Sequence, residues 1–246
     1  MFCPLPAEQW EAYETAFAAD GYDDGLRIVA ILDGKLLQIC RPTQHQRAMY
    51  TQYKKCHGVK FQGLETPDGL LVHTTEAQSG RNHDARMFRN SNLGQFWEAN
   101  ERVNQYRILA DTAYPNGGNI VSMYAAGQFE GRQERRDFNE YMAPVRQPVE
   151  WGFQRVTSLW GFLNSKHQMK MLQMSISDLW LLGVWLTNVK TCADGGNNTS
   201  TYFDVMPSSI EEYLDITLGG GAGDGDGGEG LAGGVFDVVQ MEHHNN

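Results

Sequence analysis

Three carboxylates stand where a short apolar run ends or where a helix begins. Asp33 follows the run "RIVAIL", and Asp111 follows "RILA" ahead of a polar turn. Glu150 lies two residues after Pro148, which suits the first turn of a helix. Carboxylate oxygens suit a hard divalent cation such as Mg²⁺, which takes few carboxylates together with phosphate oxygens and water. If the three converge at one end of a sheet, they can hold ions for phosphodiester cleavage.

Each carboxylate also has a plainer interpretation. Gly34 follows Asp33, and Asp-Gly is a common turn between two short strands. Asp111 fits a turn or a helix-capping aspartate before "TAYP". Glu150 fits a first-turn acid that the helix dipole favours. Residue types and spacing alone leave both sets of interpretations open.

The pattern of apolar residues predicts an α/β domain with a mixed sheet. Strands are expected at 27–39, interrupted at Asp33–Gly34, at 59–75 as a hairpin around "PDG", and at 106–110. Helices are expected at 6–19, 82–100, 148–163 and about 167–190, with a polar, arginine-rich stretch at 128–146. The aromatic residues of the two late helices should be largely buried: Trp151, Phe153, Trp160 and Trp180.

Charge is unevenly distributed along the chain, whose net charge is −10. Ten Asp or Glu and no Lys or Arg follow Lys190, so those ten acids account for the whole excess. Residues 34–190 carry 19 basic and 13 acidic residues, a net charge of +6. A basic middle is compatible with a polyanionic partner, although many proteins that never bind nucleic acid share it.

The same sequence excludes several classes of protein. The four cysteines lack C-x-x-C spacing, which favours reduced thiols over a disulfide framework or a zinc site. The first ten residues lack the basic start and apolar stretch of a signal peptide. Lys170 and Asp178 interrupt the longest apolar region, which favours a buried helix over a membrane span. We therefore expect a nuclear or cytoplasmic protein that is neither secreted nor bound to a membrane.

Five motifs follow one another along the chain: "AILDGKLLQICRP", "YKKCHGVKFQGLETPDGLLVH", "SGRNHDARMF", "LADTAYP" and "FNEYMAPVRQPVEWGFQRVTSLWGFL". In this order they resemble the Harbinger-type branch of the DDE transposase superfamily, whose catalytic part is the DDE superfamily endonuclease domain. The resemblance extends over about residues 5–215. It implies a ribonuclease H-like mixed sheet flanked by helices, in which the strands at 27–32 and 106–110 are adjacent and parallel.

The resemblance also implies an activity and its residues. The expected protein is a metal-dependent DNA endonuclease, or transposase catalytic domain, that uses Mg²⁺ or Mn²⁺ to cleave and join strands by a two-metal mechanism. Asp33, Asp111 and Glu150 match the catalytic and metal-binding triad. Six further residues match positions with supporting or DNA-contacting roles: His83, Asp84, Asn139, Arg146, Lys54 and Lys55. Their plainer interpretations are a helix start, a solvated arginine and an exposed charged loop.

Two expectations follow for the triad. Its carboxylates should lie within about 4–7 Å of one another, close enough for one or two ions. Repulsion between neighbouring carboxylates should raise the pKa of at least one of them.

Three segments are expected: a helical lead-in at 1–26, the endonuclease domain at 27–215 and a disordered, acidic Gly/Asp-rich tail at 216–246. The first aspartate strand begins so early that the family's helix-turn-helix region does not fit before it. The chain is then a fragment, a truncated copy, or a protein that takes DNA recognition from a separate partner. Holding two transposon ends together favours a homo-oligomer.

Two other functions compete with an active nuclease. The first is a domesticated, catalytically silent DNA-binding or protein-interaction domain derived from a transposase. The second is another ribonuclease H-like nuclease, such as a resolvase or exonuclease, which the hairpin position and the "VEW" segment disfavour.

Overall fold

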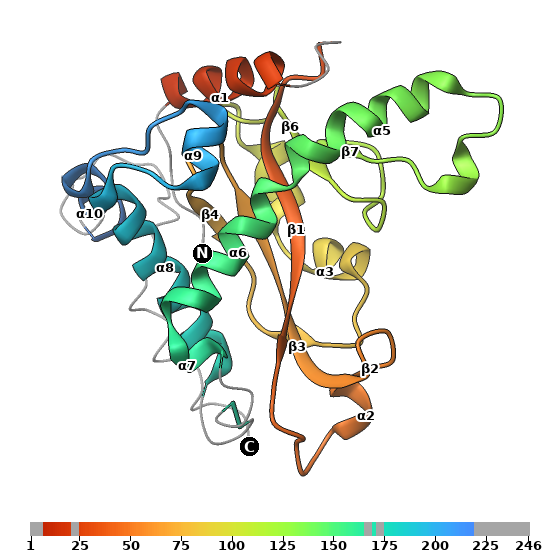
Figure 1. The fold of residues 1–246 in the computed structure, drawn as a ribbon, viewed down its shortest axis with the longest axis vertical. Helices are drawn as coiled ribbons and strands as arrows, with labels where there is room; N and C mark the ends of the chain where they lie inside the picture. Colours follow the sequence, from red (N-terminus) through yellow and green to blue (C-terminus); the bar gives the residue numbers. More distant parts are fainter. Residues whose placement is uncertain (1–6, 21–24, 165–168, 171–174, 219–246) are drawn as a thin grey trace.

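A curled mixed sheet of seven strands forms the centre of the computed structural model (Figure 1). The structure describes residues 7–20, 25–164, 169–170 and 175–218. The main path through the sheet is β2-β3-β1-β6-β7, and β4 and β5 also pair with β3. The strands are β1 (Ile28–Gln38), β2 (Tyr50–Thr51), β3 (Cys56–Glu65), β4 (Leu71–Thr74), β5 (Gln78–Ser79), β6 (Arg107–Ala110) and β7 (Ile120–Ser122).

Strand β1 has an antiparallel neighbour on one side and a parallel neighbour on the other. It pairs antiparallel with β3 and parallel with β6, and β6 in turn pairs parallel with β7. The predicted adjacency of two parallel strands at 27–32 and 106–110 is therefore confirmed, as is the hairpin around "PDG", formed by β3 and β4. The carboxyl ends of β1's parallel segment and of β6 meet at the same level of the sheet.

Strand β1 is continuous through Asp33 and Gly34, so the interruption expected there and the Asp-Gly turn interpretation are wrong. The reason is the antiparallel ladder with β3, which continues through Asp33 opposite Gly63 and Gly34 opposite Gln62. Extended pairing on both sides of the dipeptide satisfies the backbone groups that a turn would otherwise satisfy.

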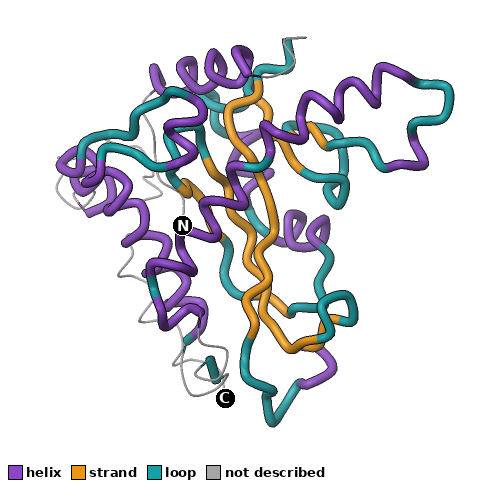
Figure 2. Tube along the Cα trace, viewed as in Figure 1, coloured by secondary structure: helices purple, strands orange, loops and turns teal. Residues whose placement is uncertain are grey.

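Helices surround the sheet on both faces (Figure 2). In chain order they are α1 (Ala7–Asp20), α2 (Gln46–Met49), α3 (Asp84–Asn90), α4 (Leu93–Ala99), the 3₁₀ turn η1 (Ala126–Gln128), α5 (Gln133–Arg146), α6 (Pro148–Leu159), α7 (Gly161–Asn164), α8 (Ile176–Asp194), α9 (Asn198–Phe203) and α10 (Ile210–Leu218). Among the described residues, no helix has the length and apolar character that crossing a bilayer requires.

Several expectations about helices need correction or fall partly outside the description. The helix expected at 148–163 ends at Leu159, because Trp160 has an extended backbone, and the short helix α7 follows. The helix expected at 82–100 is two helices, because Ser91 has an extended backbone and its hydroxyl bonds the carbonyl of Phe88. The arginine-rich stretch contains α5. The last long helix begins at Ile176 instead of 167, and residues 165–168 and 171–174 lie outside the described residues. So does the acidic tail beyond Leu218.

Each face of the sheet has its own apolar core. Helices α5, α6 and α8 cover one face, where Phe61 of β3 stacks on Trp180 with ring centroids 4.6 Å apart. Helices α1 and α4 contribute to the other core, where Trp10 packs edge-on against Trp97. Phe153 and Trp180 are buried as expected, whereas Trp151 and Trp160 are half-buried. The helical lead-in α1 thus packs as part of the folded domain.

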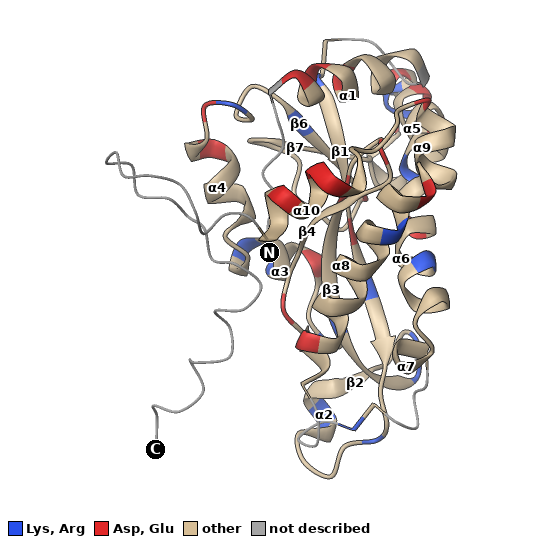
Figure 3. Ribbon diagram, turned by 90° about the vertical axis from the view of Figure 1, so that its left-hand side faces the viewer, with Lys and Arg blue, Asp and Glu red and all other residues tan. Residues whose placement is uncertain are grey.

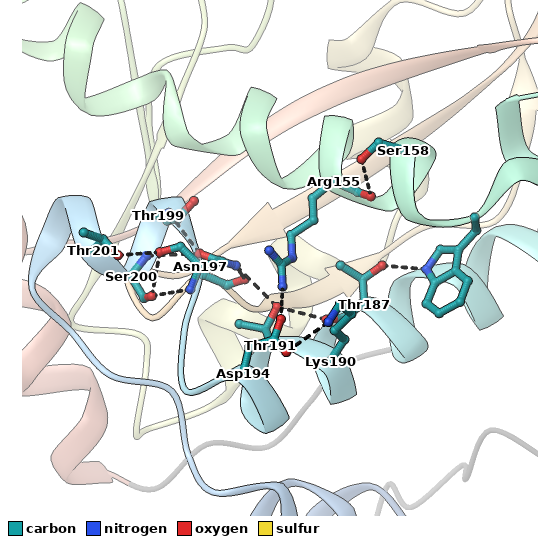
Figure 4. Close-up of polar contacts among 12 residues, drawn as sticks. Arg155, Ser158, Thr187, Lys190, Thr191, Asp194, Asn197, Thr199, Ser200 and Thr201 are labelled. Carbon is teal, nitrogen blue, oxygen red and sulfur yellow. Dashed lines mark hydrogen bonds and ion pairs between the residues drawn. The ribbon is translucent and has the colours of Figure 1, made fainter.

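A polar network fixes α6 against α8 (Figure 4). Arg155 of α6 reaches Asp194 at the end of α8 at 3.2 Å, and Lys190 pairs with the same carboxylate at 2.9 Å. The indole of Trp160 donates to the hydroxyl of Thr187 at 2.9 Å. Because Glu150 stands in the first turn of α6, this network also limits where Glu150 can lie.

A buried acid lies between the sheet and α6. Thr199 donates to one oxygen of Glu65 at 2.8 Å, and the other oxygen has no hydrogen-bond partner among the described residues. That second oxygen lies against Gly152, where a Cβ would collide with it. Burial raises the pKa of Glu65 to about 8. The side chain is therefore mainly protonated at neutral pH.

Replacing Glu65 by Gln should change how stability depends on pH. A group whose pKa rises on folding stabilises the fold fully below its unfolded value, near 4.5, and loses that contribution as pH rises to about 8. Between these values we expect the unfolding free energy of the natural protein to fall, relative to Glu65→Gln, by up to about 1.4 kcal/mol per pH unit. Denaturant titrations at several pH values measure this difference, with exposed Glu140→Gln as control. Parallel curves for the natural protein and Glu65→Gln would contradict it.

Candidate active site

Asp33 is a largely buried carboxylate in the middle of β1. It lies one residue beyond Leu32, where the pairing with β6 ends, and its side chain is 16% exposed. One of its oxygens accepts the backbone N–H of Gly34 at 2.8 Å, and the other accepts Arg146 at 3.2 Å. Burial raises the pKa of Asp33 to about 6 against the opposing effect of Arg146. The expected raised pKa is confirmed, but its largest cause is burial, with repulsion from Asp111 a smaller one.

Arg146 connects Asp33 to Glu150. Its Nη1 lies 3.2 Å from Asp33 and its Nη2 lies 3.1 Å from Glu150. Arg146 ends α5 and Glu150 begins α6, and Gln147 between them keeps helical backbone angles, so the two helices follow almost one path across the sheet. One cationic side chain, Arg146, therefore joins two members of the expected triad.

Asp111 follows β6 directly and lies near Asp33. It is close enough to raise the pKa of Asp33, and one of its oxygens accepts the backbone N–H of Ala113 at 2.8 Å. The interpretation of Asp111 as a turn residue is therefore correct for one of its oxygens, and the second carboxylate oxygen is left for another partner. The side chain of Glu150 is 58% exposed. Within the described part of the chain, no three His, Cys, Asp or Glu residues are placed to hold an ion together.

Lys35 is a site residue that the sequence analysis missed. It follows Asp33 by two positions on β1, so both side chains emerge on the same face. Burial lowers the pKa of Lys35, while Asp33 and Glu150 raise it. The signal was present as the i, i+2 spacing on a strand, but it was masked by the expectation that β1 is interrupted at Asp33–Gly34.

His83 and Asp84 lie on the other face of the sheet. Asp84, the first residue of α3, accepts a hydrogen bond from Lys60 at 2.9 Å. Its carboxylate lies against Gly34, where a Cβ would be 2.6 Å from Oδ1. Because successive strand residues point to opposite faces, Gly34 faces Asp84 while Asp33 faces Arg146. His83 precedes α3, is exposed and makes no side-chain cap.

The other expected residues have separate locations. The amide of Asn139 bonds the backbone of Tyr124 twice, accepting from its N–H at 2.9 Å and donating to its carbonyl at 2.8 Å. Asn139 thereby holds the segment after β7 against α5. Lys54 and Lys55 are exposed in the loop between β2 and β3, and the structure does not bring them into the Asp33–Arg146–Glu150 group.

Asp33 and Asp111 each follow directly the last residues that pair between β1 and β6, Leu32 and Ala110, and Arg146 contacts the first of these carboxylates. The family model described as DDE superfamily endonuclease matches residues 32–188, and the chain belongs to this family. That match includes Asp33, Asp111 and Glu150, and it is narrower than the resemblance over 5–215. No curated protein and no solved structure matches the chain.

Replacing Arg146 by Gln should raise the pKa of Asp33 further, because the guanidinium opposes the effect of burial. Carboxyl ¹³C NMR titration of Asp33 measures this change directly. Arg136→Gln, on the exposed side of the same helix, should leave the Asp33 titration unchanged. An unchanged Asp33 titration in Arg146→Gln would show that the ion pair is absent in solution.

Proposed function

We propose that this chain is the catalytic domain of a Harbinger-type transposase, a metal-dependent endonuclease that cleaves DNA strands and joins them. The observation that carries the proposal is the placement of Asp33 and Asp111 directly after the last paired residues of the parallel strands β1 and β6, inside the family match. Antiparallel pairing of β4, β3 and β1, followed by parallel pairing of β1, β6 and β7, supports a ribonuclease H-like sheet.

The donor set fits a hard divalent cation. Asp33 and Asp111 offer oxygen ligands, and Asp33 is a partly desolvated carboxylate whose charged form a nearby cation would favour. Glu150 would join this donor set only if its side chain left Arg146, with which it pairs at 3.1 Å. When bound, Mg²⁺ or Mn²⁺ would supply Lewis-acid stabilisation and an activated water.

The cations of the site would act on the DNA backbone. Lys35 makes no ion pair within the described residues, although Asp33 and Glu150 both influence it. A phosphate that approaches Asp33 would therefore find Lys35 beside it as a charge-assisted donor. Arg146 keeps Asp33 and Glu150 in place and balances their charge before DNA binds.

A catalytically silent, domesticated domain is the second candidate, and one observation favours it. Arg146 pairs with Asp33 and Glu150 together, so a cation of the protein already satisfies two of the three carboxylates. In such a domain the same residues would be structural, and DNA or protein binding would be the remaining function. The two candidates differ in whether the carboxylates are needed for strand cleavage.

Partners and location complete the proposal. DNA is the substrate of an endonuclease domain, and we infer a separate DNA-recognition protein and self-association as the means of joining two transposon ends. A nuclear or cytoplasmic location accords with these partners. The division into a lead-in at 1–26, a catalytic domain at 27–215 and a tail at 216–246 is retained, with α1 packed onto the catalytic domain.

Plasmid nicking with Mg²⁺ or Mn²⁺ tests the activity. We expect Asp33→Asn, Asp111→Asn and Glu150→Gln each to reduce nicking at least about 100-fold, the upper effect of removing even an outer-shell partner of a metal site. Exposed Asp137→Asn on α5 is the control and should nick normally. If Glu150→Gln nicks normally, Glu150 is not part of the triad. If the natural protein and all four variants show only the same background nicking, the silent domain is favoured.

A further inference from the structure

Residues 34–60, which we call the basic arm, extend the sheet away from the carboxylates. In the described structure the pairing of β1 with β6 ends at Leu32, whereas its ladder with β3 continues to Gln38 opposite Gly58. The far end of this ribbon carries α2 and β2 (Figure 1). The arm contains six Lys or Arg and no Asp or Glu: Lys35, Arg41, Arg47, Lys54, Lys55 and Lys60.

Most of the positive charge of the basic arm is left uncompensated. Lys60 pairs with Asp84 outside the arm. The four exposed cations at the far end make no ion pair with any described residue: Arg41, Arg47, Lys54 and Lys55. Figure 3 shows blue segments around α2, at the end of the molecule away from the acidic α1 and α10. The start of α5 is also rich in arginine, but unlike the basic arm it contains acidic residues, Glu134 and Asp137, among its arginines. A polyanion is the partner that such an end attracts.

Tyr53 stands at the tip of the arm with its ring in solvent. Tyr50 pairs with His57 and Thr51 with Cys56, so residues 52–55 form a four-residue hairpin loop. Tyr53 is 87% exposed, and the ammonium of Lys54 lies 5.1 Å from its ring centroid. Phosphate contacts alone make no use of an aromatic ring. An exposed ring among cations fits single-stranded nucleic acid, whose bases stack on aromatics while its phosphates meet the charges.

The β1–β3 ribbon connects the tip of the arm to the site, because its ladder continues from Asp33 opposite Gly63 to Gln38 opposite Gly58. From Asp33 to Ile39 the ribbon rises about 20 Å at roughly 3.3 Å per residue. At about 3.4 Å per nucleotide, a DNA strand covers this distance with about six nucleotides.

We propose that the tip of the basic arm, formed by Tyr53, Lys54 and Lys55, binds an unpaired stretch of the DNA strand that passes the carboxylate site, with Tyr53 stacking on one base. This inference rests on the proposed DNA-cleaving function and names the form of DNA that the domain holds beside its site. It also assigns Lys54 and Lys55 a common partner with Tyr53. A duplex, whose bases are already stacked, offers Tyr53 no free base face.

Fluorescence anisotropy of the full chain tests the stacking contact, with no divalent metal present so that binding is separated from cleavage. The probes are a labelled single-stranded oligonucleotide and a blunt duplex of the same sequence. We expect Tyr53→Ala to weaken single-strand binding about tenfold, through the loss of one base–aromatic stack. Tyr53→Phe should bind as the natural protein does, and duplex binding should change less than about twofold. Tyr141→Ala, at a 53% exposed tyrosine on α5, is the matched control.

Salt titrations test the two lysines. Lys54→Ala and Lys55→Ala should each reduce the slope of log affinity against log salt by about 0.7 on single-stranded DNA, the loss of one phosphate contact. Exposed Arg102→Ala, outside the arm, should leave the slope unchanged.

Three results would overturn the inference. If Tyr53→Ala binds single-stranded DNA normally, or loses as much affinity for duplex as for single-stranded DNA, Tyr53 does not stack on a base. The nuclease proposal then stands without the inference. If polyglutamate competes as well as single-stranded DNA, the tip is a site for acidic proteins. If the chain binds neither DNA, the inference fails, and the plasmid-nicking assay decides separately whether the nuclease proposal stands.

Discussion

The contact on which the candidate site depends is the fork of Arg146 between Asp33 and Glu150. Asp33 loses most of its hydration inside the sheet, and a buried carboxylate left without a cation is strongly destabilising. The guanidinium offsets part of that cost, since the pKa of Asp33 is still raised to about 6, and it also ties β1 to the junction of α5 and α6. Arginine suits this task because its planar fork can address two carboxylates at once, which the single ammonium of a lysine cannot do with the same geometry.

Strand β1 organises the rest through its two different edges. One edge pairs with β6 only as far as Leu32, and this places Asp111 near Asp33 because parallel strands end at the same level. The other edge continues along β3 to Gln38 and supports the basic arm. A single strand therefore carries a carboxylate, then Lys35 on the same face, and then leads to the exposed tip. Because successive side chains of a strand point to opposite faces of the sheet, the face with Asp33 and Lys35 is separate from the face with the Lys60–Asp84 ion pair.

The sequence revealed much of the fold, because hydrophobic periodicity and turn residues act locally. The hairpin around "PDG" followed from such signals and is confirmed. The parallel pairing of 27–32 with 106–110 is also confirmed, but it was implied by the family resemblance. The Asp-Gly turn was wrong because a long-range ladder with β3 outweighs the local turn preference. For the site, the carboxylate positions were readable, whereas Arg146 reaching Asp33 across 113 residues was not, since it depends on where α5 ends above the sheet. The same holds for Asn139, whose partner is the backbone of Tyr124.

Charge balance explains how one arrangement of residues can suit both a resting and a DNA-bound state. With Asp33, Asp111 and Glu150 ionised, Arg146 and Lys35 leave the group with a net charge of −1, which repels a phosphate. Burial weakens that charge by raising the pKa of Asp33 to about 6. One divalent cation would reverse the sign to +1, and a second would make it +3, enough to attract a DNA backbone. The basic arm stays positive throughout, because Arg41, Arg47, Lys54 and Lys55 have no acidic partner in the described chain. On the proposed function, the arm would hold DNA before the carboxylates accept it, so that strand binding and metal loading would be separable properties of the domain.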